Sequence, residues 1–207
     1  MLEIKCFTFG PFQTNTYIVR NEQQILLIDP ACYTPYEQQQ LENYINSQTI
    51  KLSNKDAVSN VAILATHGHL DHLWGAKWAT SKWNTPVLIH EADIPMARAI
   101  QQQYNMFGIR ATAEEFPIEP LTHSPIHPFT IIPTPGHTPG SVCLYFPEDK
   151  VLISGDTLFQ MGYGRTDLPG GNMGQLITSL ERLFALPVDT VVYPGHGDFT
   201  TIGAERR

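Results

Sequence analysis

Four side chains that can bind a metal ion lie within six consecutive residues of this chain. The stretch THGHLDH (66–72) carries His67, His69, Asp71 and His72, in a sequence with eight histidines in all. Neutral imidazole and carboxylate are the ligands that zinc, manganese and iron accept at hydrolytic sites. The side chains of His67 and His69 can point to one position, and those of Asp71 and His72, on the next turn, to a neighbouring one. The spacing therefore predicts a metal site for two ions and not merely a hydrophilic loop.

Further candidate ligands follow three other apolar runs. FTIIPTPGH ends at His137, KVLISGD ends at Asp156, and TVVYPGH ends at His196. Each has the pattern of a buried strand followed by turn residues, as VAILAT (61–66) has before the first group. Ligands of α/β sheets gather beyond the carboxyl ends of strands, so we expect five histidines and two aspartates to converge there.

The elements that must position these groups alternate between strands and helices in two comparable halves. Strands are expected over 2–9, within 16–29, and over 61–66, 86–90, 129–134, 141–146, 150–156 and 190–197. Helices are expected over 36–46, from the histidine cluster through Trp83, over 91–103, and over 174–185 with Leu176, Ile177, Leu180, Leu183 and Phe184 inward. Residues 104–128 and 159–173 are poorly patterned and are expected to shape the pocket. No linker interrupts the chain, which predicts one α/β domain over residues 1–207.

Composition predicts a globular protein that does not bind nucleic acid. Hydrophobic residues make up 42% of the chain, and the formal net charge is −7. Lys and Arg are scattered, whereas affinity for a phosphate backbone needs them clustered. Three isolated cysteines, Cys6, Cys32 and Cys143, fit buried apolar positions better than a disulfide framework. With no signal peptide or membrane-spanning run in the sequence, we expect a cytoplasmic protein that does not bind membranes.

The segments THGHLDH, PTPGHTPGS, SGDTLF and PGHG resemble the motifs of the metallo-β-lactamase superfamily, specifically its glyoxalase II-like branch of hydroxyacylglutathione hydrolases. The resemblance covers nearly the whole chain and all seven ligand positions, in the family's order. It implies a four-layer α/β fold, the αβ/βα sandwich, in which helices flank two central mixed sheets and the metals lie at one edge.

The resemblance also implies a role for each ligand. His67, His69 and His137 would hold a first divalent metal ion, Asp71, His72 and His196 a second, and Asp156 would bridge the two. Zinc is the expected metal, with iron or manganese as alternatives. Asp71 would be the catalytic ligand that orients a metal-bridging hydroxide, the nucleophile. Asp29, which precedes Pro30, would orient a ligand histidine or would simply be a turn residue.

The implied activity is hydrolysis of a small acyl-thiol, because a thiolate leaving group needs little acid assistance. The chain resembles a short form of the branch, without the helical domain that helps bind glutathione. In QMGYGRTDLPGG, Arg165 keeps a positive charge where the family contacts its substrate, but Asp167 replaces an aromatic residue. Arg165 is predicted either to pair with a substrate carboxylate or to form a salt bridge with Asp167.

Four other functions are alternatives to this interpretation. A persulfide dioxygenase of the same superfamily also carries Gly-Arg-Thr-Asp and would use one iron held by His67, His137 and Asp156. A β-lactamase is disfavoured because those enzymes are usually exported and depart from PTPGHTPGS. A tRNA-processing nuclease is disfavoured by the acidic charge and the lack of a basic arm. A non-catalytic scaffold, or the hydrolase-like half of a redox partner system, is disfavoured because a structural site would not need two metals.

Overall fold

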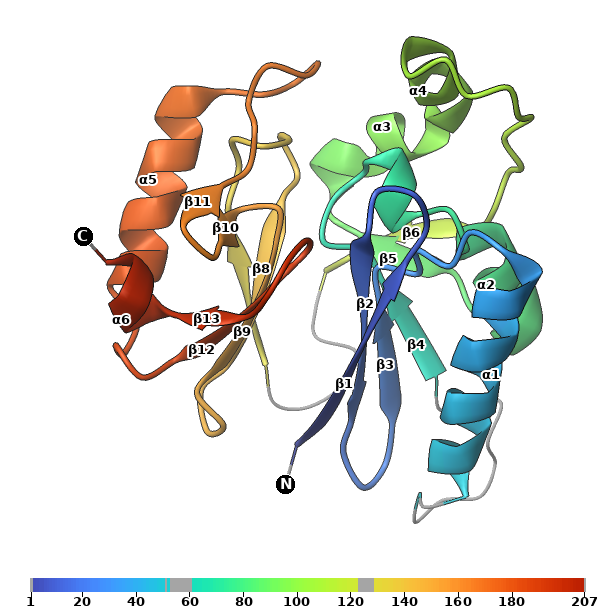
Figure 1. Cartoon of the computed structure of the whole chain (residues 1–207), viewed down its shortest axis with the longest axis horizontal. Helices are drawn as coiled ribbons and strands as arrows, with labels where there is room; N and C mark the ends of the chain where they lie inside the picture. Colours follow the sequence, from blue (N-terminus) through green and yellow to red (C-terminus); the bar gives the residue numbers. More distant parts are fainter. Residues whose placement is uncertain (1, 51, 53–60, 123–128, 207) are drawn as a thin grey trace.

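Two β-sheets pack against each other, and helices cover their outer faces (Figure 1). The computed structural model describes residues 2–50, 52, 61–122 and 129–206. One sheet has the strand order β1-β2-β3-β4-β5-β6, and the other has the order β13-β12-β9-β8-β7. The predicted fold class, an α/β sandwich with two mixed sheets between layers of helices, is therefore confirmed.

The first half of the chain builds the first sheet and its helices. The strands are β1 (Glu3–Phe9), β2 (Thr14–Arg20), β3 (Ile25–Ile28), β4 (Val61–Leu64), β5 (Val87–Ile89) and β6 (Ile118–Pro120). The helices are α1 (Pro35–Thr49), α2 (Ala76–Trp83), α3 (Ile94–Arg98) and α4 (Ile100–Met106), with 3₁₀ turns η2 (Leu70–His72) and η3 (Glu91–Asp93). Strands β1 to β3 pair antiparallel, and β3 to β6 pair parallel.

The second half builds the other sheet. Its strands are β7 (Thr130–Pro133), β8 (Val142–Phe146), β9 (Val151–Gly155), β12 (Val191–Pro194) and β13 (Thr200–Thr201), and a short hairpin is formed by β10 (Leu158–Phe159) and β11 (Gly162–Tyr163). Helices α5 (Met173–Phe184) and α6 (Ile202–Glu205) complete this half. In Figure 1 both lie on the outer side of the sheet, away from the first half.

Alternate residues of the central strands contribute to different cores. In β3, Ile25 and Leu27 pack with the core that α1 and α2 cover, whereas Leu26 and Ile28 pack with the core between the two sheets. Successive side chains of a strand point to opposite faces, so β3 is buried on both. Burial of each such side chain contributes about 1.5–3 kcal/mol. The continuous apolar run of this strand is thus explained by its position inside the sandwich.

The segment 91–103 is not the single helix that its pattern predicts. It forms η3 and then α3 and α4, which are separated at Ala99 (φ −96°, ψ 26°). Beside this break the side-chain amide of Gln103 donates to the Met96 carbonyl at 3.0 Å. Helix α4 continues to Met106, into a segment that was expected to be irregular, and β6 pairs with β5 further on. Residues 123–128 of that segment lie outside the described residues.

Three smaller expectations were wrong. Ile177 is 50% exposed, because the buried face of α5 is formed by Leu176, Leu180 and Leu183. Cys6 is exposed, whereas the other two cysteines are buried as expected. Trp74 precedes α2 instead of lying within it, although it still packs against the first core. In the described residues, no helix has the length and apolar character needed to cross a membrane.

Parallel pairing brings the predicted ligands to one edge of the molecule. Strand β3 runs parallel to β4 in the first sheet, and β9 runs parallel to β12 in the second. Backbone pairing between Thr14 and His196, and a 2.7 Å hydrogen bond from the Asn15 N–H to the Gly195 carbonyl, connect the start of β2 to the end of β12. The turns that follow β4 and β12 are therefore held close together.

Candidate metal centre

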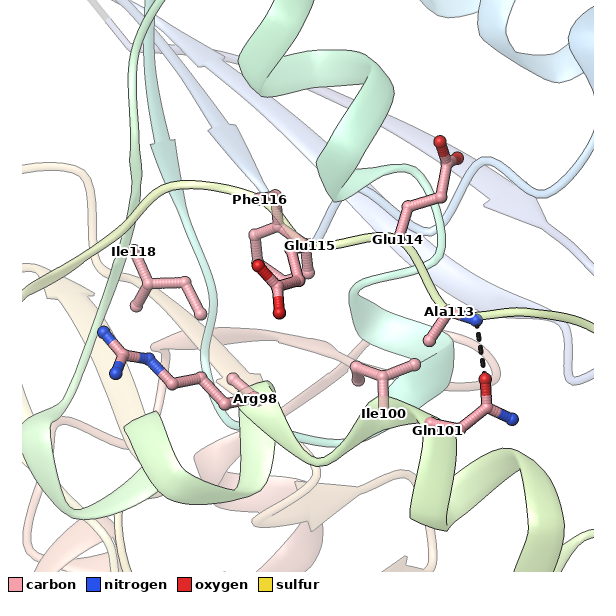
Figure 2. A pocket seen from close by; sticks show the side chains of 9 residues that line it. Arg98, Ile100, Gln101, Ala113, Glu114, Glu115, Phe116 and Ile118 are labelled. Carbon is pink, nitrogen blue, oxygen red and sulfur yellow. Dashed lines mark hydrogen bonds between the residues drawn. The ribbon is translucent and has the colours of Figure 1, made fainter.

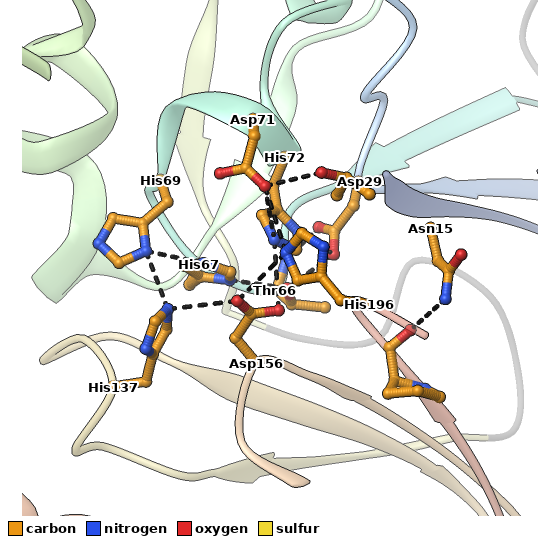
Figure 3. Close-up of polar contacts among 12 residues, drawn as sticks. Asn15, Asp29, Thr66, His67, His69, Asp71, His72, His137, Asp156 and His196 are labelled. Carbon is orange, nitrogen blue, oxygen red and sulfur yellow. Dashed lines mark hydrogen bonds and ion pairs between the residues drawn. The ribbon is translucent and has the colours of Figure 1, made fainter. Parts of the chain in front are cut away.

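Seven imidazole and carboxylate groups converge where the two sheets meet (Figure 3). They come from the turn after β4 and from the turns after β7, β9 and β12. Their donor atoms form three overlapping groups, in each of which all atoms lie within 4.8 Å of one another: His67, His69 and His137; His67, His72 and Asp156; and Asp71, His72 and His196. The structure thus brings together every residue that the sequence analysis proposed as a ligand.

The first group has nitrogen spacings close to those of a tetrahedral ion. His69 Nδ1 lies 3.1 Å from His67 Nε2 and 2.9 Å from His137 Nε2. With zinc–nitrogen bonds of about 2.0–2.1 Å, ligands of a tetrahedral site lie roughly 3.3 Å apart. Lone pairs this close repel one another unless a proton or cation lies between them. The three nitrogens are therefore arranged as the ligands of one ion would be.

Asp156 lies between the group of His67, His69 and His137, which would hold a first ion, and the group of Asp71, His72 and His196, which would hold a second. Its Oδ2 is 3.5 Å from the Nε2 atoms of both His137 and His196, and its Oδ1 is 3.3 Å from His72 Nε2. The other carboxylate, Asp71, has its Oδ2 at 3.3 Å from His196 Nε2 and at 3.5 Å from His72 Nε2. Asp156 is thus placed to contact two ions at once, and Asp71 only the second.

Two buried atoms of the cluster have no hydrogen-bond partner in the part of the chain that the structure describes and would be satisfied by a cation. His72 Nε2 and Asp156 Oδ1 make no hydrogen bond with any described residue. A buried polar atom without a partner costs about 1–3 kcal/mol, and a divalent cation between these two atoms would satisfy both. The donors are nitrogen and oxygen without thiolate, which suits zinc, iron or manganese. The residues present therefore fit divalent metal ions.

Four of the histidines have their second ring nitrogen fixed by the protein. These Nδ1 contacts join His67 to Thr66 Oγ1 (3.1 Å), His72 to Asp29 Oδ2 (2.9 Å), His137 to the Arg165 carbonyl (2.7 Å) and His196 to the Phe12 carbonyl (3.1 Å). Carbonyl and carboxylate oxygens only accept, and Thr66 Oγ1 already donates to Asp29 Oδ2, so Nδ1 carries a proton in all four rings and Nε2 is the nitrogen that faces the centre. The rings are thereby oriented for metal binding.

Asp29 combines both roles that the sequence left open. Its backbone is left-handed (φ 51°), a conformation that Asp tolerates better than most residues in a turn. Its Oδ1 accepts from the Thr66 N–H at 2.7 Å, and its Oδ2 accepts from Thr66 Oγ1 at 2.7 Å and from His72 Nδ1. The turn therefore places a carboxylate that orients a histidine and also anchors the start of the THGHLDH loop.

The histidines of the first site and those of the second site differ in their protonation. Burial, together with neighbouring histidines, lowers the pKa of His67 well below its usual value and that of His69 to about 3. Burial also lowers the pKa of His72, but Asp71 and Asp156 outweigh it and raise this pKa well above its usual value. For His196, burial is likewise outweighed by hydrogen bonds to Asp156 and Asp71, and the pKa rises to about 9. Without metal, His67 and His69 are neutral at pH 7, and His72 and His196 are protonated.

Filling both sites at pH 7 is therefore expected to release about two protons per chain, from His72 and His196. The His196 proton is present below about pH 9, and the pKa of His72 is also raised well above its usual value, so both protons compete with the metal at pH 7 and affinity at the second site should rise with pH. Isothermal titration calorimetry in buffers of different ionisation enthalpy measures the number released. His196→Ala should remove about one of the two, and binding without proton release at pH 7 would contradict the assignment.

Two contacts of the site escaped the sequence analysis. Thr14 Oγ1 donates to Asp71 Oδ2 at 2.7 Å. Asp93 is fully buried and accepts from the Gly68 N–H at 2.8 Å, from the Gly140 N–H at 2.6 Å and from Thr138 Oγ1 at 2.6 Å. These partners adjoin the ligand histidines, so Asp93 holds two ligand-bearing turns together. Neither residue lies in a recognisable motif, and their contacts are distant in the sequence.

A cleft of about 600 Å³ lies over the metal centre. Its lining includes Asp71, Asp156 and three of the histidines, with Phe12, Leu70, Gln103, Phe107, Phe159, Tyr163, Arg165 and Leu168 around them. Arg165 makes a double ion pair with Asp167, with Nε–Oδ1 at 2.6 Å and Nη2–Oδ2 at 2.7 Å, and both side chains are exposed. The predicted salt bridge is present, and the same arginine lies beside the cleft where it could meet a substrate.

Known proteins are similar to this chain in both sequence and fold. The family model of the metallo-beta-lactamase superfamily matches residues 9–196. The chain is 38% identical over 205 residues to the probable metallo-hydrolase YqgX of Bacillus subtilis, covering 95% of this chain and 91% of that protein. It is 31% identical over 218 residues to the hydroxyacylglutathione hydrolase GloC of Haemophilus influenzae, covering 100% and 96%.

A solved structure gives the same result at the level of the fold. The crystal structure of TTHA1623 in a di-iron-bound form superposes with a TM-score of 0.84 at 35% identity, covering 98% of this chain and 97% of that one. With the match of the family model over most of its length, this chain belongs to the metallo-beta-lactamase superfamily.

Proposed function

We propose that this metallo-hydrolase uses two divalent ions to hydrolyse a small thioester, a hydroxyacylglutathione-like acyl-thiol. The observation that carries the proposal is the pair of donor groups that meet at Asp156 beneath an open cleft. Among the described residues that line this cleft there is no Ser, Thr, Cys or Lys, the side chains that most often form acyl-enzyme or Schiff-base intermediates. This favours attack by water over a covalent route through the protein.

The chain's own residues hold and orient the reacting groups. Two ions bound here would supply a water of lowered pKa and a polarised substrate carbonyl. Asp71 Oδ2, held by Thr14 Oγ1 and near His196 Nε2, faces the second site and is the group proposed to orient the water. Phe12, Phe107 and Leu168 line the cleft with apolar surface.

The lining of the cleft also favours a thiolate as the leaving group. Apart from the donors, its polar side chains are Gln103, Tyr163 and Arg165. None of these side-chain types delivers a proton readily near neutral pH. An amine would need such a proton to leave, whereas a thiolate leaves as an anion. The chemistry of the cleft therefore supports thioesters over amides.

The comparisons support the same proposal. GloC of Haemophilus influenzae is a hydroxyacylglutathione hydrolase, and TTHA1623 has been crystallised in a di-iron-bound form. The formal net charge of −7 supports a small-molecule substrate over nucleic acid. We therefore propose two ions per chain, zinc or iron, and no nucleic-acid or membrane partner.

The test is the metal content per chain, measured by elemental analysis on protein purified without added metal, together with hydrolysis of S-lactoylglutathione and other thioesters. Two ions per chain with thioester hydrolysis are the expected result. Two ions with no hydrolysis of any thioester would overturn the proposed activity. One iron per chain with oxygen uptake on a persulfide would instead assign the dioxygenase, whose ligands His67, His137 and Asp156 also lie in this cluster.

Arg165→Ala is expected to raise KM for an anionic thioester about tenfold while kcat changes little, since the arginine would bind the substrate carboxylate and not the reacting atoms. The Asp167 carboxylate is paired with the Arg165 guanidinium in the structure and would compete with the substrate carboxylate for it. Asp167→Asn should therefore lower KM for the same substrate. Steady-state kinetics of both variants test whether Arg165 binds the substrate. An unchanged KM in Arg165→Ala would mean that the arginine only forms the salt bridge with Asp167.

A further inference from the structure

An apolar hollow adjoins the metal cleft on the side of His69. It has a volume of about 370 Å³, and Met96, Met106, Phe107, Pro139, Leu168 and Pro169 are among the residues that line it. His69, Gln103, Phe107 and Leu168 line both the hollow and the cleft. The hollow, which we call the apolar arm, is therefore continuous with the first donor group of the metal centre.

The lining of the apolar arm is mostly apolar, and its polar side chains are His69, Gln102 and Gln103. Among the described residues that line it there is no Asp, Glu, Lys or Arg. Its buried amide, Gln103, is already satisfied: Nε2 donates to the Gly68 and Met96 carbonyls at 3.0 Å each, and Oε1 accepts from the Leu70 N–H at 2.9 Å. This amide is thus not available to a ligand. A polar group placed among the apolar side chains, away from His69 and Gln102, would lose its water without gaining a partner, which is unfavourable.

A second hollow on the other side of α3 and α4 provides a contrast (Figure 2). It has a similar volume of about 360 Å³, but Arg98, Glu114 and Glu115 are part of its lining. It shares none of its lining residues with the metal cleft. Helices α3 and α4 therefore separate a charged surface hollow from an apolar one, and the apolar one opens onto the metal centre.

We propose that the apolar arm binds the aliphatic chain of an acyl-thioester substrate, so that, among thioesters of one thiol with unsubstituted acyl chains, this enzyme prefers medium-length chains to short ones. The inference rests on the proposed thioesterase function and names its substrate class. At roughly 30 Å³ for each heavy atom, the volume that water occupies in the liquid, a chain of eight carbons needs about 240 Å³. The arm is large enough for such a chain. The half-exposed side chains of Met106 and Phe107 are part of its lining and would contact the bound chain.

The first measurement is the kcat/KM of the metal-loaded protein on N-acetylcysteamine thioesters with acyl chains of two, four, six and eight carbons. We expect kcat/KM to rise about threefold for each added methylene, as for a chain that leaves water. The second is the Kd of butyrate and octanoate for the same protein, by calorimetry, which does not depend on turnover. Octanoate has four more methylenes than butyrate, so at the same factor it should bind about 80-fold more tightly.

Two methionines provide a matched pair of variants. Met106→Glu places a charge in the apolar arm and should remove most of the dependence on chain length in both measurements. Met173→Glu makes the same change at the start of α5, outside the arm, and should retain that dependence. The two side chains have similar exposure, 54% and 44%, so neither substitution disrupts a core.

Each outcome has a separate meaning. Hydrolysis that does not depend on chain length, with equal Kd values for butyrate and octanoate, overturns the apolar arm and leaves the thioesterase. Tight, Met106-dependent binding of octanoate without hydrolysis of any thioester supports the arm as a binding site for aliphatic chains and overturns the proposed reaction.

Discussion

Asp156→Asn is expected to lower kcat by at least about 100-fold and to reduce the metal content from two ions per chain to one or none. Asp156 is the residue whose two oxygens face both donor groups, toward His72 on one side and toward His137 and His196 on the other. Burial raises its pKa, but His72 outweighs this and holds the pKa well below its usual value, so the side chain is a carboxylate. An asparagine supplies neither the charge nor a second ligand oxygen.

The loss should be specific to the metal centre. The site is closely packed, since a Cβ at Gly195 would lie 2.1 Å from Asp156 Oδ1, and asparagine has nearly the same size as aspartate. Far-UV circular dichroism should therefore stay close to that of the wild type. Asp149→Asn, the same change in the exposed turn before β9, is the matched control and should keep two ions and full activity. Wild-type turnover and metal content in purified Asp156→Asn would contradict the dinuclear mechanism.

The ligands could be proposed from the sequence because each follows a strand that its own apolar run predicts. VAIL, TIIP, VLISG and VVYP form β4, β7, β9 and β12, and a ligand follows each of them within a few residues. Parallel pairing of β9 with β12 then brings Asp156 and His196 together, although 40 residues separate these two positions. The pairing follows from the fold class, so the sequence and the resemblance were sufficient for this part.

The break at Ala99, the apolar arm and the contacts of Asp93 depend on the three-dimensional arrangement, which no local sequence pattern predicts. The pattern of 91–103 predicts one helix, but the backbone at Ala99 breaks it, and Gln103 donates to a carbonyl on the other side of the break. The apolar arm exists only because α3, α4 and the segment around Leu168 meet in space. The partners of Asp93 lie 25, 45 and 47 residues away in the sequence. Sequence periodicity describes burial on one element and does not identify such partners.

Asp93→Ala is expected to lower the free energy of unfolding by about 3–5 kcal/mol and the melting temperature by roughly 10 °C. The substitution leaves the Gly68 and Gly140 N–H groups buried without an acceptor, and Thr138 Oγ1 loses a 2.6 Å bond to a carboxylate. Each lost bond to a charged group contributes about 1.5–3 kcal/mol, and partial relaxation reduces their sum. Urea denaturation of the metal-free protein measures the change.

The same substitution should weaken the first metal site about 10- to 100-fold, although Asp93 touches no ligand side chain. Gly68 lies between His67 and His69, and Thr138 follows His137, so Asp93 fixes the turns whose nitrogens lie 2.9 Å apart in the structure. Asp93→Asn keeps an acceptor for the Gly140 N–H but turns an amide N–H₂ toward the Gly68 N–H, and should give an intermediate loss. Glu91→Ala, at an exposed position of the same turn, should change neither stability nor metal affinity. If Asp93→Ala is destabilised but binds metal as tightly as the wild type, the two turns are held in register by the packing around them, and the role of Asp93 is limited to folding.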